Sequence, residues 1–313
     1  MHIEFSHVPG SVRTDGSARR VPFSFNADDA ARRLRLIEAA GFSRLLIDDA
    51  GGILANMDFA AFAARRTATL EIALAHWAGP IAPVVAANQL MELDRIAAGR
   101  LSLRITPALT GSQRDEPGQD GIALHGRADE YLTLLKRLWS NDRPFDFEGA
   151  HYGFRGGHVE AKGSRSLLPI RMSGLSGTAL RVAGRHADVF ELAPGTTGEV
   201  ASTVQRVRAA AAEFGRADRI RFALPLWLGR HGDSAASFIR WEGSPASISR
   251  LIAPYARLGI AELVVSGLDS AAEIEAFGTR VAPVLREMAA EDWQTGHRPA
   301  QRAAAADRRT YLF

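Results

Sequence analysis

Segments with the pattern of a strand and segments with the pattern of a helix alternate eight times along the 313-residue chain. Short apolar runs, typical of buried strands, are each followed by a longer segment whose apolar residues have helical spacing. The expected strands span residues 2–8, 45–48, 70–76, 101–105, 169–172, 189–192, 221–228 and 263–265. The helices expected after them span residues 27–40, 59–66, 83–98, 128–139, 176–185, 199–214, 247–258 and 271–288.

This alternation constrains the fold more than any other feature of the sequence. Strands that alternate with helices run parallel, and eight such pairs close most economically into a barrel. We therefore predict an α/β fold, a TIM (β/α)8 barrel. An open doubly wound sheet is the alternative, but such sheets usually carry a G-x-G-x-x-G turn after the first strand, and this chain reads Val8-Pro9-Gly10-Ser11 there.

Two segments fall outside the alternation. Residues 141–166 are glycine-rich and lack periodicity, which indicates an insertion after the fourth helix, with a small hairpin around residues 144–154. The end of the chain is polar and alanine-rich, which indicates a C-terminal arm. We expect one barrel domain over residues 1–290 and a tail over residues 291–313.

Composition excludes several classes of protein. The chain has no cysteine, so disulfides, thiolate nucleophiles and cysteine-bound metals are impossible. It has no long apolar run that could span a membrane and no signal-peptide pattern, and we expect a cytoplasmic protein. All but two of its 38 basic residues are arginines, but they are interspersed with 35 acidic residues, which indicates a solvated surface rather than a nucleic-acid interface.

Active sites of barrels lie at the carboxyl ends of the strands, where several reactive side chains are expected. The candidates for catalysis are His7, His76, Arg104 and Trp227, and we expect them to line one cavity together with Trp77. Either histidine could carry protons, although a lone histidine is often a structural group. Arg104 shares a strand face with Thr106; an inward orientation, which we favour, would let it stabilise negative charge on a ligand.

The turn after the fifth strand has the pattern of an anion site. Small residues at 173–177, Ser-Gly-Leu-Ser-Gly, lead directly into a helix. Free backbone N–H groups at a helix N-terminus favour a phosphate, although the same pattern also fits a plain tight turn. Asp48 and Asp49 could act as a base or bind a metal, but they too fit a turn, and no H-E-x-x-H motif supports a metal site.

Three stretches together resemble the bacterial luciferase-like flavin monooxygenases. They are the segment 83–100 with its Leu-Asp-Arg-x-x-x-Gly-Arg ending, the segment 127–152 with Arg-Ala-Asp-Glu-Tyr and Phe-Glu-Gly-Ala-His-Tyr, and the segment 169–188 with Pro-Ile-Arg-Met-Ser-Gly-Leu-Ser and Ala-Gly-Arg-His-Ala-Asp. Residues 243–245 and 258–267 match more weakly. The matches follow the order of the family, and they are most similar to its alkanesulfonate monooxygenase-like branch.

The resemblance implies a barrel that binds FMN as FMNH2, supplied by a partner flavin reductase, and that uses O2 to oxygenate a small organic substrate. It also implies a homodimer or homotetramer, assembled through helices near the second and third strands. The cofactor-binding residues that it implies are Ser173, Gly174, Ser176, Gly177, Thr106, His125 and Arg127.

Several positions depart from that branch. Its Arg-x-His pair on the seventh strand reads Pro225 and Trp227 here, and a tyrosine after the eighth strand reads Leu268. A long loop with an anion-binding arginine is shortened to about residues 230–243. Because a buried sulfonate needs charged partners, we expect a substrate other than an alkanesulfonate. Two alternatives remain open: a barrel that has lost catalysis, and a deazaflavin-dependent oxidoreductase.

Overall fold

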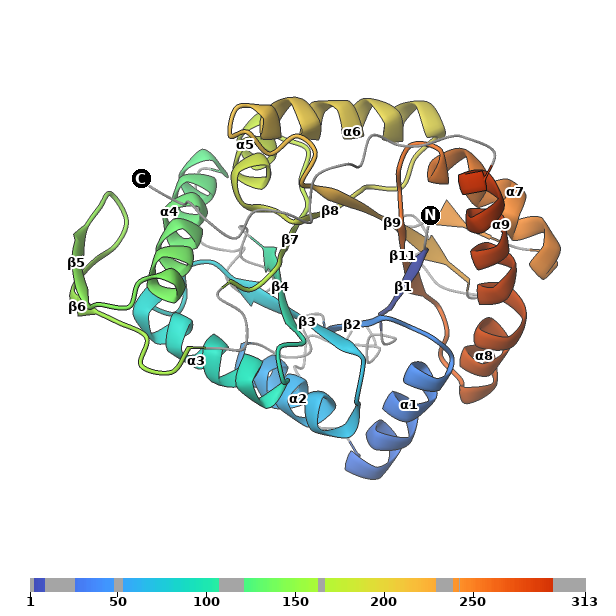
Figure 1. Ribbon diagram of the computed structural model, residues 1–313, viewed down its shortest axis with the longest axis horizontal. Helices are drawn as coiled ribbons and strands as arrows, with labels where there is room; N and C mark the ends of the chain where they lie inside the picture. Colours follow the sequence, from blue (N-terminus) through green and yellow to red (C-terminus); the bar gives the residue numbers. More distant parts are fainter. Residues whose placement is uncertain are drawn as a thin grey trace, which may run out of the picture.

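The computed structural model describes residues 3–8, 26–47, 53–106, 121–162, 167–228, 239–241 and 243–294 of the chain. Eight parallel strands close into a barrel that a ring of helices surrounds, as Figure 1 shows in a view down the barrel. The barrel strands are β1 (Glu4–His7), β2 (Arg44–Ile47), β3 (Glu71–Trp77), β4 (Leu101–Thr106), β7 (Ile170–Met172), β8 (Val189–Glu191), β9 (Arg221–Trp227) and β11 (Glu262–Ser266). The predicted TIM (β/α)8 barrel is confirmed.

The barrel closes through the pairing of β8 with β9. Each strand pairs in parallel with its neighbours in the order β11, β1, β2, β3, β4, β7, β8 and β9, and β9 pairs back with β11. β8 pairs with only the first three residues of β9, and the short strand β10 (Ile239–Arg240) pairs with the last two. The carboxyl end of β9 is therefore held on both sides.

The described residues form nine α-helices, and a side chain caps the N-terminus in several of them. They are α1 (Ala27–Ala39), α2 (Ile53–Arg66), α3 (Pro83–Ile96), α4 (Gly121–Ser140), α5 (Gly177–His186), α6 (Thr197–Ala212), α7 (Pro245–Ala256), α8 (Ala271–Ala276) and α9 (Ala282–Gln294). The side chain of Asn26 caps α1, and Thr196 and Ser270 form capping boxes with Glu199 and Glu273. A π-helical turn, Phe277–Val281, joins α8 to α9.

The core has two parts, because alternate residues of each strand face opposite sides of the barrel wall. The outward residues, such as Phe5, Leu74 and Phe222, pack with the helices in one large apolar cluster. The barrel interior holds a much smaller apolar cluster of Leu46, Ala73, Val189, Ala223 and Val264. Most of the remaining inward positions carry polar or charged side chains, which form the network described below.

The insertion contains the expected hairpin, formed by β5 (Phe145–Glu148) and β6 (Gly153–Gly157). Figure 1 shows it on the outside of the helix ring, next to α4. Two helices begin several residues earlier than expected, α2 at Ile53 and α4 at Gly121, and α6 and α7 each begin two residues early. Glycines at 121 and 126 lower the helix propensity of the first turns of α4, which is why the sequence indicates a later start. The last helix runs past residue 290 to Gln294, and residues 295–313 of the expected arm lie outside the described residues.

Candidate active site

Two tryptophans point into the barrel at the rim formed by the carboxyl ends of the strands. On β3, Trp77 lies on the same face as Ala73, and on β9, Trp227 lies on the same face as Ala223. Both alanines belong to the interior cluster, so strand alternation directs both indole rings inward. Both tryptophans are half-buried, as expected for residues at the mouth of the barrel. They offer apolar, aromatic surface to a bound ligand.

Arg104 also points into the barrel, in the orientation favoured from the sequence. It pairs in register with Ala75 and Arg171, and its Nε donates a hydrogen bond of 2.7 Å to Oε2 of Glu191. The other oxygen of Glu191 accepts a bond of 2.9 Å from Nε of Arg171. The positive charge of Arg104 is therefore compensated, which weakens the expected role in stabilising a ligand's negative charge. Thr106 follows two residues later on β4, and its side chain lies outside the described part of the chain.

The two histidines proposed for catalysis face the helix layer instead of the cavity. The ring of His7 packs edge-on against Phe42, with 5.2 Å between ring centroids, and Nε2 of His76 lies 2.8 Å from the hydroxyl of Tyr131 on α4. The expectation that both line the mouth is thus wrong. Alternation explains their placement, because His7 shares a strand face with Phe5, and His76 shares one with Leu74.

Both histidines are neutral at physiological pH. Burial lowers the pKa of His7 to about 3, and the nearby charge of Arg33 adds to this shift. Burial alone lowers the pKa of His76 to about 4. Neither ring nitrogen of His7 has a hydrogen-bond partner among the residues that the structure describes. These histidines act as parts of the core between barrel and helices.

The turn between β7 and α5 is open to solvent and leads directly into the N-terminus of the helix. Gly174 has a φ of +116°, which favours glycine, and a Cβ there would lie 2.9 Å from Cβ of Ala179. Oγ of Ser176 caps α5 by accepting a bond from the backbone N–H of Ala179. Residues 173–177 are all exposed, and a Cβ at Gly177 would meet nothing within 4 Å. Ser173, Gly174, Ser176 and Gly177 thus lie together around an open helix N-terminus.

The chemistry of this turn fits a phosphate group. The first N–H groups of α5 have no partner within the helix, and the helix dipole favours a negative charge at this end. Nη2 of Arg206 on α6 donates a bond of 2.8 Å to the carbonyl oxygen of Leu175, which fixes the turn from outside. This bond was not expected, because no sequence pattern connects α6 to the turn.

His125 and Arg127 lie within the first half of α4, whereas the sequence places them just before the helix. Nε of Arg127 donates to the hydroxyl of Tyr152, and its Nη2 donates to the carbonyl oxygen of Gly79 after β3. Its guanidinium also lies over the ring of Tyr152. Neither partner belongs to the β7–α5 turn, so the structure connects Arg127 to the end of β3 and to the hairpin. A contact of either residue with a cofactor stays a prediction.

Charged residues that the sequence pattern did not single out occupy much of the rest of the barrel interior. Arg171 donates to Glu262 with bonds of 2.7 and 3.1 Å, and Arg44 lies 2.9 Å from the same carboxylate. The two arginines and Oγ of Ser6, which donates a bond to Glu262, lower the pKa of that carboxyl to about 2 against the effect of burial. The available signal was a set of charged residues within otherwise apolar strands.

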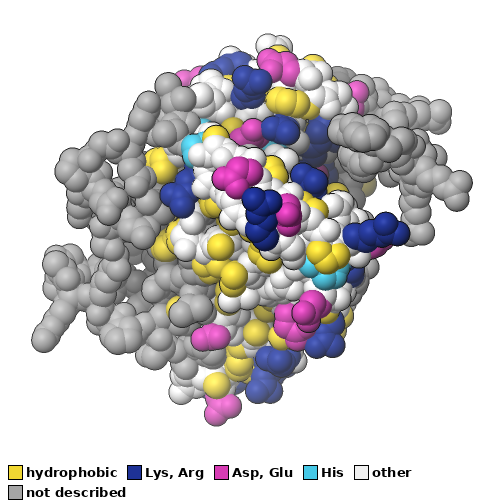
Figure 2. All heavy atoms as spheres, turned by 90° about the vertical axis from the view of Figure 1, so that its left-hand side faces the viewer, with side chains coloured by type: hydrophobic (Ala, Val, Ile, Leu, Met, Phe, Trp, Pro, Cys, Tyr) yellow, Lys and Arg dark blue, Asp and Glu magenta, His cyan; other side chains and the backbone are white. Residues whose placement is uncertain are grey.

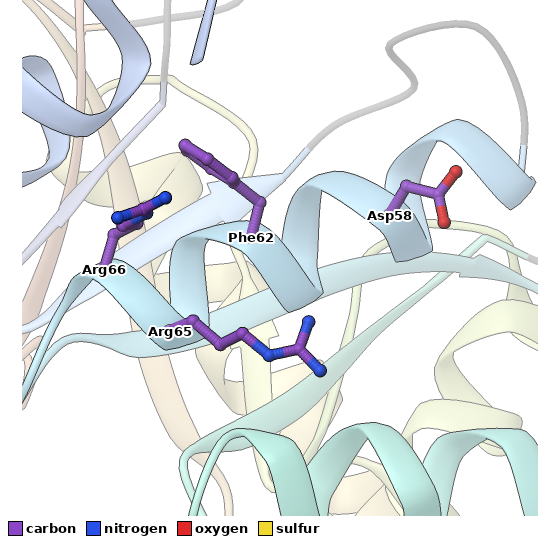
Figure 3. Close-up of a pocket in the computed structure, with 4 residues that line it drawn as sticks. All are labelled: Asp58, Phe62, Arg65 and Arg66. Atoms are coloured by element: carbon purple, nitrogen blue, oxygen red, sulfur yellow. The ribbon is translucent and has the colours of Figure 1, made fainter. Parts of the chain in front are cut away.

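Two hollows in the described surface lie away from the barrel mouth. One, of about 510 Å³, lies on α2 between Asp58, Phe62, Arg65 and Arg66 (Figure 3). The other, of about 340 Å³, lies where α4, α5 and the hairpin meet, and Asp129, His151 and Arg185 are among its lining residues. On the face shown in Figure 2, basic and acidic side chains are interspersed, in agreement with the expected solvated surface.

Among the described residues, no group of three or more histidine, aspartate or glutamate side chains could hold a metal ion. Within the same ranges, no helix is long and apolar enough to cross a membrane. Asp48, Asp49 and most of the shortened loop at residues 230–243 lie outside the described residues.

Comparisons with known proteins agree with the barrel fold. The family model described as luciferase-like monooxygenase matches residues 4–235. A solved long-chain alkane monooxygenase, LadA, superposes with a TM-score of 0.77 at 14% identity, covering 97% of this chain and 94% of that one. EDTA monooxygenase from Chelativorans sp. BNC1 gives a TM-score of 0.74 at 13% identity, with 92% and 94% covered. The coenzyme F420-dependent tetrahydromethanopterin reductase from Methanopyrus kandleri gives 0.72 at 16% identity, with 90% and 99% covered.

Proposed function

This chain belongs to the luciferase-like monooxygenase family, and we propose that it is the oxygenating component of a two-component system. In this proposal a separate flavin reductase supplies FMNH2 in the cytoplasm, and the barrel uses it with O2 to oxygenate a small organic substrate. Two solved proteins with the same fold are named as monooxygenases. When bound, reduced FMN supplies the electrons that activate O2.

The observation that carries the proposal is the open turn at Ser173–Gly177, next to a rim with inward tryptophans. The exposed N–H groups of the turn would hold the phosphate of FMN. Trp77 and Trp227 would offer apolar surface to the flavin ring and to the substrate. We keep Arg104, Thr106, His125 and Arg127 as candidate contacts of the cofactor.

The substrate proposed here is not a simple alkanesulfonate. On the β9 and β11 side of the mouth, Pro225 and Trp227 face inward, and Leu268 follows β11 as a buried apolar residue. A buried sulfonate would find no cationic partner at these three positions, and leaving such a charge unpaired costs several kcal/mol. The positions favour an apolar or aromatic substrate.

Anaerobic titration of the protein with reduced FMN tests the proposal. We expect reduced FMN to bind more tightly than oxidised FMN and more tightly than reduced F420. Coenzyme F420 is the cofactor named for the reductase with the same fold. A clear preference for reduced F420 would instead identify a deazaflavin-dependent oxidoreductase. If the protein binds none of the three, the reading as a barrel without catalysis replaces this proposal.

We also propose that two copies associate through α2 and the neighbouring α3, as a homodimer or within a homotetramer. The hollow on α2 is lined by exposed charges around the half-buried Phe62, and Val85 on α3 is an exposed apolar residue. A second copy would cover both.

A further inference from the structure

Six ionised side chains form a continuous chain of ion pairs through the barrel interior. The order is Glu71, Arg44, Glu262, Arg171, Glu191 and Arg104. The successive nitrogen–oxygen distances are 2.8, 2.9, 2.7, 2.9 and 2.7 Å. Negative and positive groups alternate without exception, so three carboxylates compensate three guanidinium groups.

The chain runs from the amino end of the barrel to the mouth. Glu71 is the first residue of β3, whereas Glu191 is the last residue of β8. The four middle side chains are at most 9% exposed, but Glu71 at one end is 24% exposed and Arg104 at the other is 30% exposed. A further carboxylate, Glu4, lies between Arg44 and Arg221 at the amino end, so its charge is compensated there.

Burial of these groups requires such pairing. A buried charge that lacks a partner is far less stable than a paired one, and each arginine here has a carboxylate within hydrogen-bond distance. At the mouth the consequence is specific: the charge of Arg104 is balanced by a carboxylate that Arg171 also holds in place. The inward side chains closest to it on β3, Ala75 and Trp77, are uncharged.

We infer that Glu191 determines the charge of the ligand that this cavity accepts, and that the substrate is an uncharged molecule. This inference rests on the proposed function, because it names the substrate class of that same site. By compensating Arg104, Glu191 removes the attraction that an isolated guanidinium would exert on a carboxylate or sulfonate. The ion-pair chain holds the carboxylate of Glu191 between the guanidinium groups of Arg171 and Arg104.

Two reciprocal variants test the inference with simple aromatic probes. Glu191→Gln removes the negative charge next to Arg104, so the affinity for benzoate relative to uncharged benzamide should be about tenfold higher than in the natural protein. Arg104→Gln leaves an excess carboxylate near the mouth, so benzylammonium should gain about tenfold relative to benzamide. Calorimetry on the protein without flavin measures both ratios. Because Arg104 is partly exposed, Arg104→Gln should fold even if Glu191→Gln does not, and it then tests the inference by itself.

Glu71→Gln is the matched control, because it removes a carboxylate from the same chain at the opposite end of the barrel. It should alter thermal stability but leave the benzoate-to-benzamide ratio unchanged. Unchanged ratios in a folded Glu191→Gln or Arg104→Gln protein would overturn the inference. It would also be overturned if Glu71→Gln raised the benzoate-to-benzamide ratio as much as Glu191→Gln does, or if no probe bound to any variant. Titration with reduced FMN is independent of these ratios, so failure of the proposed function is recognised separately.

Discussion

At Gly177, the first residue of α5, the effects of a negative charge on folding and on binding have opposite signs. An acidic residue in the first turn of a helix is stabilised by the helix dipole, and a side chain here meets no atom within 4 Å. The same charge would repel a phosphate bound at this turn. We therefore expect Gly177→Asp to fold normally and to bind reduced FMN at least tenfold more weakly, as measured by anaerobic titration.

Gly177→Asn is the control for this prediction, because asparagine has nearly the same size and no charge. It should lower the affinity much less than aspartate does. Reduced riboflavin has no phosphate, so its affinity should be nearly equal in the two variants. Equal affinities of the aspartate and asparagine variants for reduced FMN would show that the phosphate does not bind at this turn.

His7 makes the stability of the protein depend on pH. Its pKa is lowered to about 3 in the folded protein from 6.5, so between these values the unfolded chain binds more protons than the folded one. Stability from this residue is complete above pH 6.5 and is lost as the pH falls. Since one pKa unit corresponds to about 1.4 kcal/mol, lowering the pH from 6.5 to 4.5 should reduce the free energy of unfolding by about 2–3 kcal/mol through His7 alone.

His7→Leu should flatten this part of the pH profile, because leucine has no proton to gain and fits an apolar environment next to Phe42. Urea unfolding at pH 6.5 and at pH 4.5 measures the difference. His151→Gln, at an exposed position, serves as the comparison and should leave the slope unchanged. A His7→Leu protein with the natural slope would contradict this explanation.

At the scale of elements, the proposed exclusion of alkanesulfonates depends on β9 and on the residues after β11. Pro225, Trp227 and Leu268 provide no charge, so 1-octanesulfonate should give no release of sulfite above background when the protein is supplied with a flavin reductase, FMN and O2. Sulfite formation is measured with a thiol-reactive dye. Efficient release of sulfite, at rates typical of an enzyme acting on its own substrate, would show that another cation serves the sulfonate.

The elements themselves could be predicted because each is specified locally. The apolar runs gave every barrel strand, and Asn26 and Ser176, which the structure shows as helix caps, stand at expected helix starts. Strand faces could have been read with the same rule of alternation: His76 follows Ile72 and Leu74 at every second position. Applied there, the rule predicts an outward histidine.

The ion-pair chain could not be predicted in the same way, because its partners come from strands far apart in the sequence. Arg171 and Glu262 are separated by 91 positions, and Arg104 and Glu191 by 87. A single sequence shows that charged residues interrupt apolar strands, but it does not show which strands become neighbours across the barrel interior. Pairing follows only from the closed geometry.

At the scale of the whole molecule, the surface of α2 has a pattern that can pair with itself. Asp58, Phe62, Arg65 and Arg66 follow at helical spacing, so they share one side of the helix, and Figure 3 shows Asp58 toward one end and the arginines toward the other. In a twofold dimer with antiparallel α2 helices, Asp58 of each copy would face Arg65 of the other, with the two Phe62 rings at the centre.

Charge reversal on α2 tests this arrangement. Asp58→Arg and Arg65→Asp each place like charges opposite one another twice, once on each side of the twofold axis, so each should weaken dimerisation about tenfold or more. The double variant Asp58→Arg/Arg65→Asp exchanges the two charges within one chain, and its copies should dimerise nearly as well as the natural protein because both attractive pairs are restored. Sedimentation velocity across a dilution series measures the dissociation constants of the natural protein, the two single variants and the double variant. Rescue by the double variant distinguishes direct pairing from a general effect of surface charge. If the double variant dissociates as readily as the single variants, the α2 helices of the two copies do not contact each other in the dimer.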